Sequence, residues 1–480
     1  MLDYDVERRG TLARYEYLYR RIRDDILSGE LAADDRLPSK RQLAAQLGVS
    51  LATVEGAYTQ LEAEGYVEAR PRRGYYVNAL PRLGQRAAVP VHMESDGATE
   101  EDTPSLVADF SAPATRADSS AANLWERALR QALAQEPREE LFGAQPAEGT
   151  GRLRAAIAGH LRGTRGVDVD PACIVVGAGA QTVYAMVARL MGTDATFAVE
   201  DPGYGRVWAT YASCGNQVVF VPTDEEGIRA DLLAQTGATV AHVMPSHQFP
   251  TGCVTSAARR YELLGWAAAA EGRYLVEDDY DCEFRMAGRP VSPLLAADAG
   301  GRVIYVNTFS KSLSSALRLA YLVLPPQLAQ AWRERLGFLS CTVSVVDQVA
   351  LARLLESGDY ERHVMRYRAA QRKLRDRLVG AIEAGSLAGR AAFEEVDSGL
   401  HFVLAVGVGE GKDAVETERA VARAALARGV RLAPLSSYAH DVANSARPDG
   451  RARFVMQYDG LDPAAIPQVV AALEDAVAEA

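Results

Sequence analysis

Apolar positions in the first eighty residues recur at helical spacing in three separate stretches. The first stretch stops at Gly29, and its predicted apolar face comprises Tyr15, Leu18, Ile22, Ile26 and Leu27. Ser39 is placed to cap a second, shorter helix that closes at Gly48, and Ser50 to cap a third that ends at Gly65. Two short helices joined by a tight turn that contains glycine predict a helix-turn-helix.

A pair of short strands is predicted directly after these helices. The segment reads GYVEARPRRGYYV, with apolar and aromatic residues on either side of an arginine-rich turn. Such a hairpin forms a wing, so we expect a winged helix-turn-helix domain over residues 11–79. Residues 80–105 show no periodicity but contain prolines, glycines and an acidic cluster, which is typical of a flexible linker.

The pattern changes again from residue 106 to the end of the chain. Helical stretches alternate with short apolar runs bounded by turn signals: CIVVGAG, TFAVED, VVFVP, VAHVMPS, RYLVEDD, RVIYVNT and AYLVLP. This alternation predicts an α/β domain with a large, mainly parallel sheet over residues 106–480. Helices followed by FEEVD, HFVLAV and RFVMQY predict a smaller α/β subdomain over residues 340–480.

Composition narrows the class of protein. A hydrophobic share of 48% with 24% charged residues is ordinary for a soluble chain, and no apolar run is long enough to span a bilayer. The N-terminus, MLDYDVERRG, lacks the features of a secretion signal, so we expect a cytoplasmic protein. The five cysteines form no CxxC pair and the seven histidines show no ligand spacing, so no metal site is expected.

The net charge of −11 does not exclude a nucleic-acid partner, because local patches decide phosphate binding. Basic residues of the N-terminal domain cluster at Arg20, Arg21, Arg23, Arg36, Lys40, Arg41, Arg70, Arg72 and Arg73. The motif LPSKRQLAAQLGVS, followed by TV, AY and LEAEGY, resembles the winged-helix domain of the GntR superfamily over roughly residues 11–78. This resemblance implies a double-stranded DNA operator as the partner.

Several residues of this domain are placed to contact DNA. The third helix would enter the major groove with its N-terminal end toward the bases, and the wing would approach the backbone or the minor groove. The predicted contacts are Arg41, Ser50, Thr53, Arg72, Arg73 and Gly74. Relatives often carry arginine at the position of Leu51, and some carry arginine at the position of Glu55. Because this chain lacks both arginines, its motif does not predict the operator sequence. The alternative interpretation is a pair of surface helices with solvated charges.

Residues 274–324 contain side chains that suit an aldehyde cofactor. Such a cofactor needs an amine for a Schiff base, a carboxylate at its pyridine nitrogen, a donor to its ring hydroxyl, a stacking ring and a phosphate site. Lys311 in TFSK can supply the amine, and Asp278 and Tyr280 the carboxylate and the phenol. The remaining candidates, for stacking and for the phosphate, are Tyr204, Ser310, Arg318 and the backbone N–H groups of Ala180 and Gln181.

This region resembles the fold-type I aminotransferases from about residue 106 to the end. PSHQFPTG, VEDPGYG, EDDYD.EF and TFSKSL together are similar to the MocR family, in which a GntR head precedes such a domain. The resemblance implies pyridoxal 5'-phosphate as cofactor and Lys311 as the Schiff-base lysine of an internal aldimine. Asp278 would pair with the pyridinium, Tyr280 would bond the ring oxygen, and Tyr204 would stack. Ser310 and Arg318 would hold the phosphate.

Two more arginines match positions at which relatives bind an effector carboxylate. These are Arg206 and Arg453, and Arg451 is a rival for the second role. A structural ion pair is the alternative interpretation of each.

The chain also departs from true aminotransferases. Phe249 stands where they have the asparagine of NPTG, so the ring oxygen would depend on Tyr280 and on His247. This change favours binding over tuned turnover. Ser315 and Ala316 replace a Pro-Gly pair of many members, which predicts a differently shaped lysine loop.

The resulting hypothesis is a transcriptional regulator, not an enzyme, that senses pyridoxal phosphate itself, an amine or an amino acid. We expect a homodimer. The family resemblance implies that each head rests on the partner's large domain. An active aminotransferase with an accessory DNA-binding head is the main alternative. A domain that has lost its cofactor and serves only for dimerisation is the third. The TFSKSLS variant is similar to members that control vitamin B6 synthesis, although the sequence names no target gene.

Overall fold

The computed structural model describes residue 2 and residues 4–80, 106–112, 119–288, 291–409, 412–445 and 449–480. It separates the chain into two compact units, residues 1–102 and 103–480. The linker predicted for residues 80–105 lies outside the described residues apart from Leu80. The domain limits therefore stay predictions, and each unit is described by itself.

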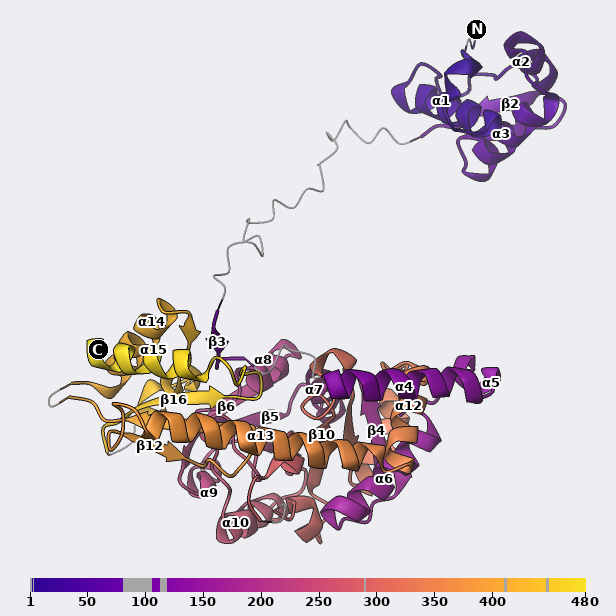
Figure 1. Ribbon diagram of the computed structural model, residues 1–480. Helices are drawn as coiled ribbons and strands as arrows, with labels where there is room; N and C mark the ends of the chain where they lie inside the picture. Colours follow the sequence, from indigo (N-terminus) through magenta and orange to yellow (C-terminus); the bar gives the residue numbers. More distant parts are fainter. Residues whose placement is uncertain are drawn as a thin grey trace. The chain divides into compact units, whose positions relative to one another are not determined.

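The N-terminal unit is a winged helix-turn-helix (Figure 1). A short 3₁₀ turn, Val6–Arg9, precedes helices α1 (Arg14–Ser28), α2 (Lys40–Leu47) and α3 (Leu51–Ala63). Strands β1 (Val67–Arg70) and β2 (Gly74–Val77) pair antiparallel as the wing. The predicted face of α1 is buried at Leu18, Ile22 and Ile26, against Leu43 of α2 and Val54, Tyr58 and Leu61 of α3.

The predicted caps set the limits of α2 and α3. Ser39 begins α2 with a reciprocal capping box, because its side chain accepts from the N–H of Gln42 while the Gln42 side chain accepts from the N–H of Ser39. Ser50 accepts from the N–H of Thr53 and begins α3. Gly48, at a φ of 63°, closes α2 in the left-handed conformation that glycine adopts without strain.

The second unit is built on an eight-stranded sheet with the order β4-β11-β10-β9-β8-β5-β6-β7. Its strands are β4 (Ile174–Gly177), β5 (Thr196–Asp201), β6 (Gln217–Asp224), β7 (Gly227–Ile228), β8 (Val240–Val243), β9 (Tyr274–Asp278), β10 (Val303–Thr308) and β11 (Ala320–Val323). The strands from β10 to β6 run parallel, whereas β11 is antiparallel to both of its neighbours and β7 is antiparallel to β6. The mainly parallel sheet predicted from the apolar runs is confirmed.

Helices cover both faces of this sheet. They are α4 (Ser119–Gln135), α5 (Arg138–Phe142), α6 (Gly151–Arg165), α7 (Ala180–Met191), α8 (Gly205–Ser213), α9 (Ala230–Leu233), α10 (Ala257–Ala268), α11 (Pro326–Leu336) and α12 (Val345–Glu356). Helices α7, α8 and α11 share one core with the sheet, α9 and α10 share another, and α4, α6 and α12 a third. Consecutive strand residues such as Phe197 and Ala198 belong to different cores, because side chains alternate across a strand.

The C-terminal part forms the smaller α/β subdomain. Its sheet has the order β12-β13-β16-β15, from strands β12 (Ala391–Glu394), β13 (His401–Val406), β15 (Ala433–Pro434) and β16 (Ala452–Gln457). Its helices are α13 (Asp359–Glu383), α14 (Ala414–Leu426) and α15 (Ile466–Glu479), and α13 is the long orange helix of Figure 1. A separate parallel pair joins β3 (Ala108–Asp109) to β14 (Val430–Arg431). Among the described residues, no helix has both the length and the hydropathy to cross a membrane.

Candidate functional site

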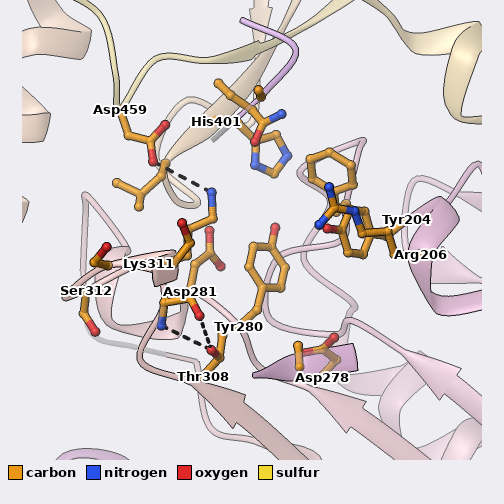
Figure 2. Close-up of a pocket in the computed structure, with 18 of the residues that line it drawn as sticks. Tyr204, Arg206, Asp278, Tyr280, Asp281, Thr308, Lys311, Ser312, His401 and Asp459 are labelled. Carbon is orange, nitrogen blue, oxygen red and sulfur yellow. Dashed lines mark hydrogen bonds and ion pairs between the residues drawn. The ribbon is translucent and has the colours of Figure 1, made fainter. Parts of the chain in front are cut away.

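A cavity of about 650 Å³ opens where the parallel strands of the large sheet end (Figure 2). Open α/β sheets bind their ligands at this edge. The structure brings to it nine residues predicted from the sequence: Ala180, Gln181, Tyr204, Arg206, Asp278, Tyr280, Ser310, Lys311 and Arg318. They come from segments up to 138 residues apart (180 to 318), so the fold, not local sequence, assembles them.

Lys311 lies in the loop that follows β10. Its Nζ is 3.8 Å from a carboxylate oxygen of Asp459, whose side chain is only 4% exposed. The next residue fixes the loop, since the Ser312 hydroxyl contacts the Tyr360 hydroxyl at 2.8 Å and the Ser312 carbonyl contacts Nε2 of His363 at 2.7 Å. These contacts anchor the residue next to Lys311, and the amine of Lys311 lies in the cavity lining.

Asp278 ends β9 and is buried behind the cavity floor. Its Oδ2 accepts a hydrogen bond from the Tyr184 hydroxyl, and Nε2 of His242 lies 3.4 Å from the same oxygen. Burial raises the pKa of Tyr184 well above its usual range, so this phenol stays a donor. The Tyr211 hydroxyl, 2.8 Å from Nδ1 of His242, continues the network. A carboxylate positioned in this way suits a buried cationic nitrogen.

Gly179 and Arg318 form a cradle at the N-terminus of α7. A Cβ built at residue 179, where φ is +84°, would lie 2.5 Å from Cζ of Arg318, so only glycine leaves room for the guanidinium. Arg318 itself adopts a φ of +51°, which is unusual for a side chain of its size. Ser310 lies nearby, hydrogen-bonded to the Thr308 hydroxyl at 2.9 Å. The first N–H groups of α7 and this guanidinium together provide the donors that an anion requires.

Aromatic side chains form the wall beside Arg206. The ring of Tyr204 meets Phe249 edge-on at 5.5 Å, and Phe249 meets Tyr438 in the same way at 5.1 Å. Arg206 is exposed at the start of α8, and its guanidinium forms no ion pair with any residue in the described part of the chain. The wall can therefore stack on a planar ring while Arg206 stays available to an anion.

Arg453 is not brought to this cavity. Its guanidinium is held by Glu394 at 2.9 Å and Asp449 at 2.8 Å, and the side chain is 5% exposed. Arg451, the rival for the same role, lies beside Asp449 at 3.7 Å. Of the two arginines predicted to bind an effector carboxylate, only Arg206 lines the cavity. Arg453 instead forms structural ion pairs, which was the alternative interpretation of this residue.

Sequence reasoning missed several residues of the cavity lining, among them Asp281, His401 and Asp459. Asp281 directly follows the DxY pair, so its position on the edge could have been noticed. His401 begins β13 and Asp459 follows β16, and both reach the cavity from the small subdomain. Nothing in their local sequence indicates this, because the packing of the two subdomains brings them there.

The predicted DNA contacts of the N-terminal unit lie at the starts of α2 and α3 and on the wing. The Ser50 hydroxyl lies 2.8 Å from that of Thr53 at the N-terminus of α3. Arg72, at a φ of +64°, shapes the turn between β1 and β2 together with Arg73, and both are exposed. Glu55, on the exposed side of α3, forms a 2.9 Å ion pair with Lys40 of α2. These groups are solvent-accessible, as DNA contacts must be.

A winged helix-turn-helix followed by an aminotransferase-like domain defines a class of transcriptional regulators. Residues 14–77 match the family described as bacterial regulatory proteins, gntR family, and residues 115–472 match aminotransferase class I and II. Because relatives at 30–34% identity span most of the chain, it belongs to the MocR-type HTH transcriptional regulators of the GntR superfamily.

Three of these relatives show the extent of the match. The HTH-type transcriptional regulator YhdI of Bacillus subtilis is 32% identical, over 90% of this chain and 90% of the relative. The probable rhizopine catabolism regulatory protein MocR of Rhizobium meliloti is 30% identical, over 98% and 95%. The pyridoxine biosynthesis transcriptional regulator PdxR of Corynebacterium glutamicum is 34% identical, over 88% of each chain.

Solved structures agree with the fold of the second unit. The multiple substrate aminotransferase of Thermococcus profundus superposes with a TM-score of 0.66 at 21% identity, covering 79% of this chain and 92% of that chain. LysN, the alpha-aminoadipate aminotransferase of Thermus thermophilus, superposes with a TM-score of 0.62 at 24% identity, covering 78% and 92%. The predicted fold-type I aminotransferase-like architecture is confirmed. The three relatives compared by sequence are named as regulators, not enzymes.

Proposed function

We propose that this regulator binds pyridoxal 5'-phosphate in the cavity and changes its DNA binding when an amine or amino-acid effector reacts there. The observation that carries this proposal is the meeting of Lys311, Asp278 and the Gly179–Arg318 cradle in one cavity. An amine, a carboxylate and an anion site are the three groups that this cofactor requires at its aldehyde, ring nitrogen and phosphate.

The residues divide this task among themselves. Arg318, Ser310 and the N–H groups of Ala180 and Gln181 hold the phosphate, Asp278 pairs with the ring nitrogen, and Tyr204 stacks on the ring. Tyr280 donates to the ring oxygen. Pyridoxal phosphate supplies an aldehyde that condenses reversibly with amines. Arg206 would bind the carboxylate of the effector. Lys311 would hold the aldehyde of the cofactor, and an effector amine that took its place there would leave the Lys311 amine free, which would change charge and packing beside the small subdomain.

One experiment tests both halves of the proposal. Pyridoxal phosphate is titrated into the purified protein while the absorbance spectrum is recorded, and amines and amino acids are then screened for shifting the visible band. In parallel, binding to duplexes selected from a random pool is measured with and without each candidate. A visible band, together with an effector that changes both the spectrum and the DNA affinity, supports the proposal. A protein that stays colourless contradicts it.

The cradle predicts a loss of cofactor affinity in Gly179→Ala. The added methyl group would displace the Arg318 guanidinium. A charge-assisted hydrogen bond contributes about 1.5–3 kcal/mol, so we expect cofactor affinity to fall by about 10- to 100-fold. Gly192→Ala is the matched control, because Gly192 has a φ of +89° at the other end of α7 but no atom within 4 Å of its Cβ position. An equal loss in both variants, measured by absorbance titration, would mean that backbone strain alone is responsible.

DNA binding is proposed to use α3 and the wing. Thr53 and Ser50 contact phosphates or base edges, Arg41 contacts a phosphate or guanine, and Arg72, Arg73 and Gly74 follow the backbone or minor groove. The exposure of Arg41, Ser50, Arg72 and Arg73, with Thr53 and Gly74 half-buried, supports this arrangement.

Arg73→Ala is expected to weaken binding to all duplexes alike. Loss of one phosphate contact lowers the slope of log affinity against log salt concentration by about 0.9. Fluorescence anisotropy at several salt concentrations measures the slope. Arg162→Ala, which removes an exposed arginine from α6, is the control and should leave the slope unchanged. A change in base preference without a change in slope would assign Arg73 to base readout instead.

A homodimer is proposed as the working form. Helix-turn-helix proteins read paired half-sites as dimers, so operator symmetry demands two heads. Phe142 and Phe338, which are 74% and 81% exposed on the second unit, are apolar surface suited to such an interface. The exchange of heads between protomers stays a prediction, as do the target genes. Relatives at similar identity are named for rhizopine catabolism and for pyridoxine biosynthesis.

A further inference from the structure

Behind Tyr280 lies a buried group of polar side chains that the proposed function does not use. His247 follows β8, Asp281 follows β9 and His401 begins β13, and they are 2%, 1% and 3% exposed. Nδ1 of His247 is 2.7 Å from Oδ2 of Asp281 and 3.3 Å from the Tyr280 hydroxyl. The His401 ring packs on the His247 ring at 4.2 Å between centroids. Any side chain at Gly399 would collide with the His247–Asp281 pair, which is therefore closely enclosed.

The position of the imidazole proton follows from these contacts. Burial, with the charges of Lys311 and Arg285, lowers the pKa of His247 to about 3, so the ring is neutral and has one N–H. Nε2 has no hydrogen-bond partner among the described residues, whereas Nδ1 faces Asp281. A buried N–H without an acceptor is costly, so the proton belongs on Nδ1.

Asp281 is the acceptor in this arrangement. Burial raises the pKa of Asp281 well above its usual range, although the charge of Lys311 and the backbone N–H of Leu400 act against this rise. Oδ2 of Asp281 can accept the single N–H of His247 in either protonation state, because a protonated carboxyl holds its proton on one oxygen and still accepts at the other. The Tyr280 oxygen, 3.3 Å from the same nitrogen, is a second acceptor. Burial raises the pKa of Tyr280 well above its usual range, so the phenol keeps its own proton. Because its oxygen accepts from His247, this proton points away from His247.

We infer that His247 and Asp281 are positioning residues that commit the Tyr280 hydroxyl proton to the ring oxygen of the cofactor. The inference rests on the proposed function, because it assumes that pyridoxal phosphate occupies the cavity. Figure 2 shows the Tyr280 hydroxyl on the same side of the cavity as Lys311 and His401. In true aminotransferases an asparagine contacts this ring oxygen, and here Phe249 stands in its place. The buried pair strengthens the single phenol donor that remains.

A metal ion fits this group poorly. The ligand atoms of His247, Asp281 and His401 lie within 4.8 Å of one another, so their spacing alone does not exclude a metal. The positive charges of Lys311 and Arg285, however, act on His247 and oppose a cation. The charged and titratable groups that face His247 are Tyr280, Asp281, Lys311, Arg285 and His401.

The test is a spectrophotometric pH titration of the cofactor-loaded protein. A donor to the ring oxygen stabilises its anionic form, so it lowers the midpoint pH at which the bound cofactor loses its proton. His247→Phe keeps the stacking but removes the N–H that polarises Tyr280, and we expect the midpoint to rise by about one pH unit. His247→Asn, which can present an N–H near the Nδ1 position, should restore most of the original midpoint.

His160→Phe is the matched control. It removes another histidine–carboxylate pair, which is partly buried: Nδ1 of His160 lies 2.7 Å from Glu361, on α6 and α13 away from the cavity lining. It should lower stability without moving the midpoint. If the midpoint of His247→Phe also stays within a few tenths of a unit of the wild type, the inference fails.

Asp281→Asn gives a second test, because loss of charge and loss of hydrogen-bond alignment move the midpoint pH in opposite directions. Loss of a negative charge alone would lower the midpoint, since a carboxylate favours the protonated cofactor. Loss of the hydrogen bond from His247 to Tyr280 would instead raise the midpoint. The amide introduced at position 281 can donate to Nδ1 of His247, and that nitrogen can then no longer donate to Tyr280. A rise supports the inference and a fall overturns it.

Two further outcomes distinguish this inference from the proposed function. A wild-type protein that develops no visible band with pyridoxal phosphate would refute the proposed function itself. A midpoint that moves only when Zn²⁺ is added, and returns with a chelator, would make the group a metal site and overturn the inference alone.

Discussion

Lys311→Ala is expected to abolish the visible absorbance band of bound pyridoxal phosphate and every spectral response to added amines. The cavity has one lysine in its described lining, so no other primary amine there can take its place. The phosphate cradle and Asp278 remain, and the variant should still bind the cofactor non-covalently. DNA binding by the head should persist but lose its response to the effector, because that response depends on the release of Lys311.

Two further variants separate chemistry from stability. Removal of Lys311 leaves Asp459, 4% exposed, without its cation, which destabilises the fold. Lys311→Arg keeps a positive charge beside Asp459 but cannot condense with an aldehyde, so it should keep the stability and lose the band. Lys373→Ala, on the exposed side of α13, should change neither property. A visible band that survives in Lys311→Arg would show that a different amine holds the cofactor.

The cofactor site was predictable to the extent that its residues lie at strand ends. Residues at the ends of β5, β9 and β10 must meet at one edge of a parallel sheet, so Tyr204, Asp278 and Lys311 could be grouped before any fold was known. The caps Ser39 and Ser50 were equally accessible, because a cap acts within one turn of its own helix.

The contributions of the small subdomain were not predictable in this way. Arg453 occupies the strand position that suggested an effector contact, yet it forms ion pairs with Glu394 and Asp449 and is absent from the cavity lining. His401 and Asp459 reach the cavity only through the packing of this subdomain against the large one. Their positions depend on contacts between segments far apart in the chain, and no local pattern encodes such contacts.

Asp278 and Asp279 are adjacent carboxylates with opposite surroundings. Side chains alternate across a strand, so Asp278 faces the cavity with Tyr184, while Asp279 faces the other side of the sheet. There Asp279 forms a 2.6 Å ion pair with Arg165 and accepts from the Tyr305 hydroxyl at 2.7 Å. Both carboxylates are buried, at 2% and 1% exposed. Substitutions at these two positions can therefore distinguish a carboxylate that contacts the cofactor from one that stabilises the fold.

Asp278→Asn is expected to weaken cofactor binding by about two to four orders of magnitude, because breaking one partner of a buried charge pair costs about 3–5 kcal/mol. Tyr184 can still donate to the amide oxygen, so the fold should remain stable.

Asp279→Asn should show the reverse pattern, with normal cofactor binding and a less stable fold. It leaves the Arg165 guanidinium, 4% exposed, without a carboxylate, which lowers the free energy of unfolding while the cavity lining is unchanged. Absorbance titration and denaturant unfolding of the two variants measure these effects. If Asp278→Asn retains wild-type affinity, the ring nitrogen is not paired with this carboxylate, and the cofactor must lie in the cavity in another orientation.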